Sequence, residues 1–329
     1  MTFPYFSGNG TRRAEQATLP RSRRPDFLKP ENFRADPGVV DAVNVALLLG
    51  QPLLLTGEPG TGKTQLGYYI AWELGLAQVL KFETKSGSTA TSLFYSYDAL
   101  KRFQHVQSGV RSETALPYIT YNALGAAILY TRDPDEVAPY LPEGQLHPGK
   151  SRSLVIIDEI DKAPRDFPND ILNELDQLYF RIPELDNRPI TSDDALRPIV
   201  ILTSNSEKDL PDAFLRRCIF YHIPFPGAAE MRQIVESRLG VFAGGSTELL
   251  SDALDLFYAL RTRATLRKKP ATAELLEWIT TLQTGGDAVA NPLRADPGAA
   301  TRTLSALVKT VEDQEKARRI VEEWAAQRK

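Results

Sequence analysis

Short apolar runs alternate with amphipathic stretches from about residue 36 to residue 226. Uninterrupted apolar runs of this length are typical of strands that are buried on both faces of a parallel sheet. The runs that predict strands are PLLLT (52–56), QVLKFE (78–83), SLVII (153–157), IVILT (199–203) and IFYHI (219–223). Because helical patterns separate them, the sequence predicts an α/β fold in which helices sandwich a parallel sheet.

Helical spacing of apolar residues fills several of the intervals between these strands. The predicted helices cover 36–50, the stretch from Lys63 to Gly75, 166–180 and a short segment near 120–130. The first begins with an acidic residue and a proline and stops at Gly50, which are start and stop signals of a helix. The stretch 108–152 is rich in Gly, Pro and Tyr, and we expect loops around its short helix.

The strand pattern stops at about residue 227, and helical spacing continues alone. The predicted helices there cover 228–240, 248–264, 271–283 and 301–324. Residues 1–30 differ again, because they place arginines among Gly, Ser and Pro without an apolar period: Arg12, Arg13, Arg21, Arg23 and Arg24. This tail is either a solvated arm or a docking arm for a partner subunit or nucleic acid. We therefore expect a flexible tail (1–30), an α/β domain (31–226) and a smaller all-helical domain (227–329).

Composition narrows the class of protein. The chain has 329 residues, a formal net charge of −3 and one cysteine. Bulk charge therefore favours no polyanionic partner, and an intrachain disulfide framework is excluded. No apolar run approaches the roughly 20 residues of a membrane helix, and the N-terminus MTFPYFSGNG lacks the apolar core of a secretory signal. Three widely spaced histidines predict no zinc site, and we expect a soluble, cytoplasmic protein without a membrane partner.

The segment after the first predicted strand matches the pattern G-x-x-x-x-G-K-[ST] in full. Its residues are Gly57, Glu58, Pro59, Gly60, Thr61, Gly62, Lys63 and Thr64. Glycines let backbone N–H groups point inward at phosphate oxygens, and the helix that follows directs its positive end at the same anion. The Lys63 ammonium suits the β- and γ-phosphates, and the Thr64 hydroxyl suits Mg²⁺. With a strand before it and a helix after it, we expect a phosphate-binding loop rather than a turn that binds nothing.

The strand predicted at 153–157 is followed by two acids, Asp158 and Glu159. The carboxyl end of a strand in an open α/β sheet lies in the crevice where ligands bind. We therefore expect Asp158 to hold Mg²⁺ through water, and Glu159 to orient and polarise an attacking water. The alternative is that both acids are merely solvated residues at the edge of the sheet. The complete phosphate loop earlier in the chain makes this alternative the weaker one.

Two later segments add candidate residues. Asn205 follows the strand at 199–203, and it either hydrogen-bonds the γ-phosphate or the lytic water or forms a turn. The segment 211–218 carries Arg216 and Arg217. They are either a surface pair or a source of one or two guanidinium groups for the γ-phosphate held by a neighbouring subunit. A guanidinium suits that role because it spreads its charge over several donors.

The order GEPGTGKT, LVIIDEIDKAP, ILTSN and PDAFLRRC, with a helical domain behind it, resembles the AAA+ ATPases and, among them, the MoxR-like branch. The resemblance covers roughly residues 30–329, and it implies a P-loop NTPase fold with a helical lid. It identifies the motif residues as Lys63 and Thr64 in Walker A, Asp158 and Glu159 in Walker B, and Asn205 in sensor 1. Arg217 best matches the arginine finger, because it comes just before the final strand, and Arg216 is the second choice.

Two local features favour the MoxR-like branch. The segment 179–190 predicts a hairpin before the sensor 1 strand, and 87–102 resembles the insert that the family carries in its second helix. Both lie where AAA+ relatives engage substrate in a central pore. The aromatic residues Phe94, Tyr95 and Tyr97 accordingly belong either to the core or to the pore.

One motif departs from the family pattern. The sensor 2 arginine at the start of a lid helix aligns with Ala273, and Lys269 or Lys268 in the preceding turn is expected to substitute for it in nucleotide binding. The alternative is a solvated basic start of a helix. Because lysine neutralises phosphate without gripping it bidentately, the departure concerns lid-side control of hydrolysis and not nucleotide binding.

The resemblance also implies a function. MoxR-like ATPases bind ATP and Mg²⁺ between the subunits of a ring, six by resemblance, and use hydrolysis to remodel or activate a protein client. They often act with a partner that bears a von Willebrand factor A domain. ATP is favoured over GTP because no N-K-x-D motif follows the strands. Two alternatives stay open: a DNA-directed motor or loader, supported only by the arginine-rich tail, and a nucleotide-dependent switch with little turnover.

Overall fold

The computed structural model describes residues 18–19, 21, 27–109, 114–205, 209–240, 246–285, 289–296 and 298–327. The described residues form two compact units. One unit, here called the α/β unit, contains Ala35–Glu58 and Gly62–Pro224. The other, the helical unit, contains the described residues of Met1–Arg34, Pro59–Thr61 and Phe225–Lys329.

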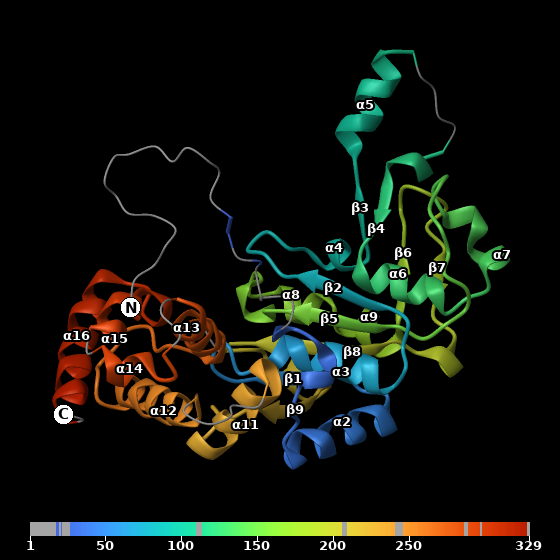
Figure 1. The fold of residues 1–329 in the computed structure, drawn as a ribbon. Helices are drawn as coiled ribbons and strands as arrows, with labels where there is room; N and C mark the ends of the chain where they lie inside the picture. The colour runs from blue at the N-terminus through green and yellow to red at the C-terminus, as the bar shows by residue number, and fades with distance from the viewer. Residues whose placement is uncertain are drawn as a thin grey trace. The chain divides into compact units, whose positions relative to one another are not determined.

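A parallel five-stranded sheet forms the centre of the α/β unit, with helices flanking it (Figure 1). The strands are β1 (Leu53–Thr56), β2 (Val79–Glu83), β5 (Leu154–Asp158), β8 (Ile199–Ser204) and β9 (Ile219–His222). Their order is β2-β5-β8-β1-β9, and every neighbouring pair is parallel. Every residue of β1 and β5 is buried, as the continuous apolar runs predicted. The five predicted strands and the α/β fold class are confirmed.

The register of the sheet brings the ends of three strands together. Thr56 at the end of β1 lies opposite Ser204 at the end of β8. On the other side of β8, Ile157 of β5 lies opposite Leu202. Residues that follow β1, β5 and β8 in the sequence therefore meet at one edge of the sheet, where parallel strands of an open α/β sheet usually form a ligand site.

The helices that start and end this unit follow the predicted signals. Asp36 caps α2 (Pro37–Leu49) by accepting hydrogen bonds from the Gly38 and Val39 amides, and Gly50 ends it with a φ of 62°. The helix after the phosphate loop is α3 (Lys63–Glu73). The remaining helices of the unit are α4 (Ala90–Phe94), α5 (Ala99–Gln107), α6 (Ala123–Tyr130), α7 (Pro134–Val137), α8 (Phe167–Asp170), α9 (Leu172–Gln177) and α10 (Asp212–Leu215). Short 3₁₀ turns span Leu116–Tyr118, Ala138–Tyr140, Ile160–Lys162 and Asp194–Leu196.

Two antiparallel ribbons are added to the parallel sheet. Strands β3 (Tyr95–Tyr97) and β4 (Ile119–Tyr121) pair with each other, and α5 lies between them in sequence. Figure 1 shows α5 at the end of this ribbon, away from the five-stranded sheet. Strands β6 (Tyr179–Arg181) and β7 (Pro189–Thr191) form the second ribbon, which directly precedes β8 and confirms the predicted hairpin.

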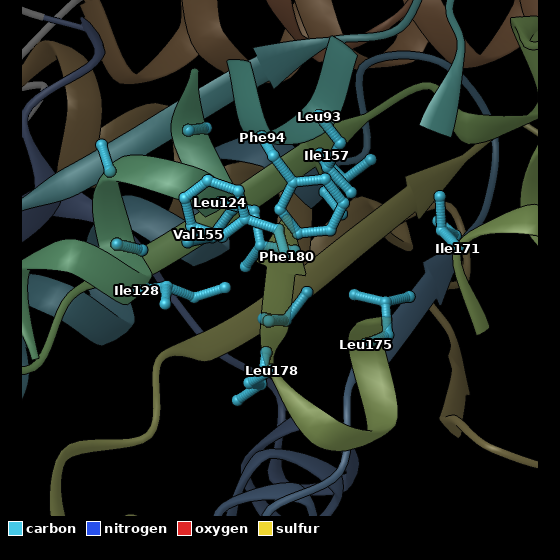
Figure 2. Packing of buried hydrophobic residues seen from close by; sticks show 14 of the residues in the cluster. Leu93, Phe94, Leu124, Ile128, Val155, Ile157, Ile171, Leu175, Leu178 and Phe180 are labelled. Atoms are coloured by element: carbon cyan, nitrogen blue, oxygen red, sulfur yellow. The ribbon is translucent and has the colours of Figure 1, made fainter. Parts of the chain in front are cut away.

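The core of the α/β unit centres on Phe180 of β6 (Figure 2). Its ring stacks on Phe94 at 5.4 Å and 12° and meets Tyr121 edge-on at 6.1 Å. Phe94 and Tyr95 are each only 3% exposed, so they belong to the core and not to a pore surface. Tyr97 is half-buried and accepts a hydrogen bond from Arg102 at 2.8 Å.

Two helix predictions were too long. The stretch 166–180 forms α8 and α9, interrupted at Ile171, and the chain then enters β6 through Leu178, which has a φ of 48°. Helical periodicity did not reveal that the last aromatic residue belongs to a buried hairpin. The stretch 301–324 forms α15 (Ala299–Leu307) and α16 (Val311–Ala326). Thr310 begins the second of these by accepting a hydrogen bond from the Asp313 amide, an N-cap signal that the continuous apolar period concealed.

The helical unit has a core of its own around Trp278, which is fully buried and donates a hydrogen bond to Thr303 at 2.7 Å. Its other helices are α11 (Ala228–Leu239), α12 (Ser246–Thr262), α13 (Thr272–Thr284) and α14 (Pro292–Ala295), and a 3₁₀ turn spans Pro30–Asn32. Arg238 of α11 donates hydrogen bonds to the carbonyl groups of Phe27 and Lys29, so the end of the predicted tail is held there. Arg12, Arg13, Arg23 and Arg24 lie outside the described residues. Among the helices of the described ranges, none combines the length and apolar composition needed to cross a bilayer.

Replacing Phe180 with alanine is expected to lower the free energy of unfolding by about 3–5 kcal/mol, because it leaves a cavity beside the rings of Phe94 and Tyr121. Phe220 of β9 is 55% exposed and serves as a matched control, and its replacement with alanine is expected to cost about 1 kcal/mol or less. Denaturant unfolding of the two variants measures the difference. Equal costs would contradict the assignment of the core.

Candidate functional site

The phosphate loop connects β1 to α3 and closes around Lys63. Gly57 has a φ of 144° and Gly62 a φ of 92°, values that side-chain-bearing residues rarely adopt. The Lys63 side chain is buried, and its Nζ donates hydrogen bonds to the carbonyl oxygens of Gly57 at 2.8 Å and Glu58 at 3.0 Å. Burial lowers the pKa of Lys63, although Asp161, Asp158 and Glu159 act in the opposite direction. A partly desolvated cation is thus held at the centre of the loop.

The start of α3 is arranged to receive an anion. Gly62 is the residue before the helix, and a glycine has no side chain that could cap the first amides. The first turn of a helix leaves N–H groups without intrahelical partners and carries a partial positive charge. A phosphate group satisfies both features, as at other helix N-termini that follow a glycine-rich loop.

Asp158 gathers side chains from three other elements. Its Oδ1 accepts hydrogen bonds from the hydroxyls of Thr64 at 2.8 Å and Thr203 at 2.6 Å. Its Oδ2 forms an ion pair with Lys81 of β2 at 2.8 Å. Burial raises the pKa of Asp158, but the bonds from Lys81, Thr203 and Thr64 outweigh it and hold the pKa below the usual value. The carboxylate therefore stays ionised although its side chain is only 12% exposed.

Glu159 occupies a different environment one residue later. It is a non-glycine residue with a φ of 56°, a conformation that costs on the order of 1–3 kcal/mol. Its amide donates to the Thr203 hydroxyl at 2.9 Å, so Thr203 links the two neighbouring acids. Asn205 donates to the Glu159 Oε1 at 3.2 Å, and Lys162 pairs with the other oxygen. The Glu159 side chain is 38% exposed, which leaves it accessible where Asp158 is not.

Asn205 is fixed by a buried acid that sequence reasoning did not single out. Asp161 is only 3% exposed, and its two carboxylate oxygens accept hydrogen bonds from the Asn205 backbone amide at 3.3 and 3.2 Å. Thr203, Asp161, Lys81 and Lys162 are the site residues that the sequence analysis missed. Thr203 and Asp161 lie inside motif segments, where a polar residue in a buried stretch was an available signal. Lys81 lies on another strand, and nothing in its local sequence indicated a partner at Asp158.

The donors at this edge suit Mg²⁺. A threonine hydroxyl and a carboxylate are hard oxygen ligands, and Mg²⁺ typically takes one or two carboxylates together with substrate phosphates and water. In the part of the chain that the structure describes, no group of three or more His, Cys, Asp and Glu side chains could hold a metal alone. The residues therefore fit a metal that binds together with a phosphate ligand.

The two candidate arginines lie apart from this cluster. Arg217 forms an ion pair with Asp176 of the same chain, with Nε and Oδ2 at 2.8 Å. Arg216, directly after α10, is exposed, and within the described ranges no hydrogen bond or ion pair holds its side chain. No such contact joins either arginine to the described residues of the phosphate loop or to Asp158 and Glu159.

Lys268 and Lys269 lie in the turn before α13, in the helical unit. Asp313, which is fully buried, accepts hydrogen bonds from the Arg267 amide at 2.9 Å and the Lys268 amide at 3.0 Å. The backbone of this basic turn is thereby fixed, while the Lys268 and Lys269 side chains are exposed. Ala273, which aligns with the family's sensor 2 arginine, lies in the first turn of α13.

Comparison with known proteins places this geometry in context. Residues 53–226, more than half of the chain, match the family model described as "ATPase family associated with various cellular activities (AAA)". Among solved structures, the chain is similar to domain III of the replication initiation protein DnaA from Thermotoga maritima. The identity is 15%, the alignment covers 87% of this chain and 99% of that chain, and the TM-score is 0.43, a likeness too distant to bear on function. No curated protein matches the chain.

Cys218 offers a pH-dependent test of the segment that carries the arginines. Burial, with Asp176 nearby, raises the pKa of the Cys218 thiol to about 12, whereas an unfolded cysteine has a pKa of about 8.5. Because the thiolate is the reactive species, we expect little alkylation by iodoacetamide at pH 8 in the folded protein and fast alkylation in denaturant. Mass spectrometry of timed samples measures both rates. Equal rates in the two conditions would contradict the half-buried placement of Cys218.

Proposed function

Because the chain belongs to the AAA family of ATPases, we propose that it binds ATP with Mg²⁺ at Gly57–Thr64 and hydrolyses the terminal phosphoanhydride bond. One observation carries the proposal: Thr64 of the phosphate loop and Thr203 of β8 donate to the same oxygen of Asp158. This arrangement joins a phosphate cradle to the acids that ATP hydrolysis requires.

The residues of the site have different roles in this proposal, according to where they lie. The loop amides and the start of α3 bind the phosphates, and Lys63 exchanges its bonds to loop carbonyls for bonds to the β- and γ-phosphates. Cofactor binding also involves the remaining loop residues Glu58, Pro59, Gly60, Thr61 and Gly62. When bound by the Thr64 hydroxyl and, through water, by Asp158, Mg²⁺ supplies positive charge that offsets the phosphate charge.

Glu159 is proposed to orient the attacking water, because its carboxylate is accessible while that of Asp158 is buried. The water oxygen forms a bond to the γ-phosphorus as the bond to the β–γ bridging oxygen breaks, which yields ADP and inorganic phosphate. Asn205 already donates to Glu159, and this contact supports a role in holding the carboxylate or the water in place. Lys162 must give up its ion pair with Glu159 for the carboxylate to accept from water.

We further propose that ATP binds between the subunits of a ring of six, the number that the resemblance implies, and that an arginine from the neighbouring subunit completes the site. The resemblance favours Arg217. The ion pair of Arg217 with Asp176 instead supports Arg216, which can reach another molecule without first breaking an ion pair.

The inserted ribbon and the hairpin support the MoxR-like branch. The ribbon β3–β4 with α5 interrupts the helical region between α4 and α6, and the hairpin β6–β7 precedes β8, as the resemblance implied. On α5, Leu100, Phe103 and Val106 are 66%, 58% and 59% exposed. They form an apolar stripe suited to a protein client, with or without a partner that bears a von Willebrand factor A domain.

In this scheme residues 31–226 act as the nucleotide-binding domain and 227–329 as the lid. Lys269 or Lys268 supplies a positive charge from the lid in place of a sensor 2 arginine. Support for the DNA-directed alternative is confined to the tail arginines, of which only Arg21 lies within the described residues.

Two substitutions test binding and hydrolysis separately. Lys63→Ala is expected to weaken binding of Mg²⁺–ATP at least about tenfold, because it removes charge-assisted bonds to phosphate. Glu159→Gln is expected to bind ATP like the wild type and to hydrolyse it on the order of 100-fold more slowly. Calorimetric titration and phosphate release measure the two quantities. Equally low turnover in the wild type and Glu159→Gln would favour the switch with little turnover.

Mixing experiments test the arginine in trans. Arg216→Ala is expected to bind ATP but to lose turnover by on the order of 10³-fold, and Arg217→Ala is expected to lose less. Mixing inactive Arg216→Ala with inactive Lys63→Ala should restore activity, because Lys63→Ala subunits supply Arg216 to intact phosphate loops. Absence of restoration in mixed assemblies would contradict a role across the subunit interface.

A further inference from the structure

Lys81 lies between two carboxylates at the edge of the site. It is two residues before Glu83 on β2, so the two side chains share a face of the sheet. Glu83 lies opposite Asp158 in the register of β2 with β5. The Lys81 Nζ is 2.9 Å from Glu83 Oε1 and 2.8 Å from Asp158 Oδ2, and it therefore bridges the two acids.

The hydrogen-bonding capacity of Asp158 shows what this bridge controls. An ionised carboxylate offers about four lone-pair positions. Thr64 and Thr203 use the two on Oδ1, and Lys81 uses one on Oδ2. One position on Oδ2 remains for a water of the Mg²⁺ shell. We propose that Lys81 is a positioning residue of the ATPase site, which holds Asp158 in the orientation that presents this remaining lone pair to the metal-bound water.

The two ion pairs of Lys81 differ in how much they contribute. Glu83 is 71% exposed, and a pairing with so exposed a group contributes little. Asp158 is 12% exposed, and there an unpaired oxygen next to a second acid is costly. Without Lys81, Glu83 and Asp158 would face each other across adjacent strands as like charges, which is unfavourable. The ion pair of Lys81 with Asp158 therefore accounts for the positioning role. The ion pair with Glu83 adds little to it.

The inference rests on the proposed function, because it assigns Lys81 a role only if Mg²⁺–ATP binds at this edge. The test uses the full-length chain and a ribose-labelled fluorescent ATP, titrated once in EDTA and once in excess Mg²⁺. Lys81→Met removes the charge, and Lys81→Arg keeps it. Lys85→Met is the matched control, because Lys85 is an exposed lysine nearby in the sequence, and within the described residues its side chain forms no ion pair with Asp158.

Lys81→Met is expected to weaken binding in Mg²⁺ by about 10–100-fold, the usual effect of removing a partner that orients a metal ligand. Binding in EDTA should stay close to that of the wild type, and Lys81→Arg should recover most of the loss. Lys85→Met should leave both affinities unchanged. This split between the two conditions is one that a purely structural role of Lys81 would not produce.

Three results would overturn the inference. The first is that Lys81→Met binds ATP in Mg²⁺ as tightly as the wild type, and the second is that it loses the same affinity in EDTA as in Mg²⁺. The third is that Lys85→Met loses as much affinity in Mg²⁺ as Lys81→Met, which would indicate an effect of general charge and not of positioning. Failure of the proposed function looks different, because the wild type itself would then bind no ATP in Mg²⁺.

Discussion

The geometry of the site depends on the hydroxyl group of Thr203. It donates to Asp158 at 2.6 Å and accepts from the Glu159 amide at 2.9 Å, so one side chain of β8 sets the positions of two consecutive acids at the end of β5. Thr203 is 1% exposed and cannot exchange these bonds for water. The parallel register of β5 and β8 brings it there, and the buried apolar strands keep the register in place.

Two neighbouring acids acquire different properties from this arrangement. Asp158 is buried and fully engaged, and its low pKa keeps it an anion that can meet a metal-bound water. Glu159 is turned by its left-handed backbone into a partly exposed position, where its contacts to Asn205 and Lys162 can be exchanged for water. The backbone strain at Glu159 is stored where an active site commonly stores it. Charge and conformation together separate the metal-holding role that we propose for Asp158 from the water-orienting role that we propose for Glu159.

Local patterns carried the fold prediction, and tertiary contacts limited it. The five strands were predictable because each is a continuous apolar run, and the phosphate loop because its glycines, lysine and threonine are adjacent in sequence. The break between α15 and α16 was missed because the apolar period runs through it and only the Thr310 cap marks it. The contact of Lys81 with Asp158 spans two strands and depends on register, which no local pattern encodes. The ion pair of Arg217 with Asp176 could not be predicted from the sequence either.

The most direct test of the account is a crystal structure of the chain with Mn²⁺ and a non-hydrolysable ATP analogue. The account predicts an anomalous peak for Mn²⁺ beside the Thr64 hydroxyl, with the phosphates inside the loop Gly57–Thr64 and Asp158 still bonded to Thr203. A nucleotide bound elsewhere, or Mn²⁺ bound away from Thr64 and Asp158, would contradict it.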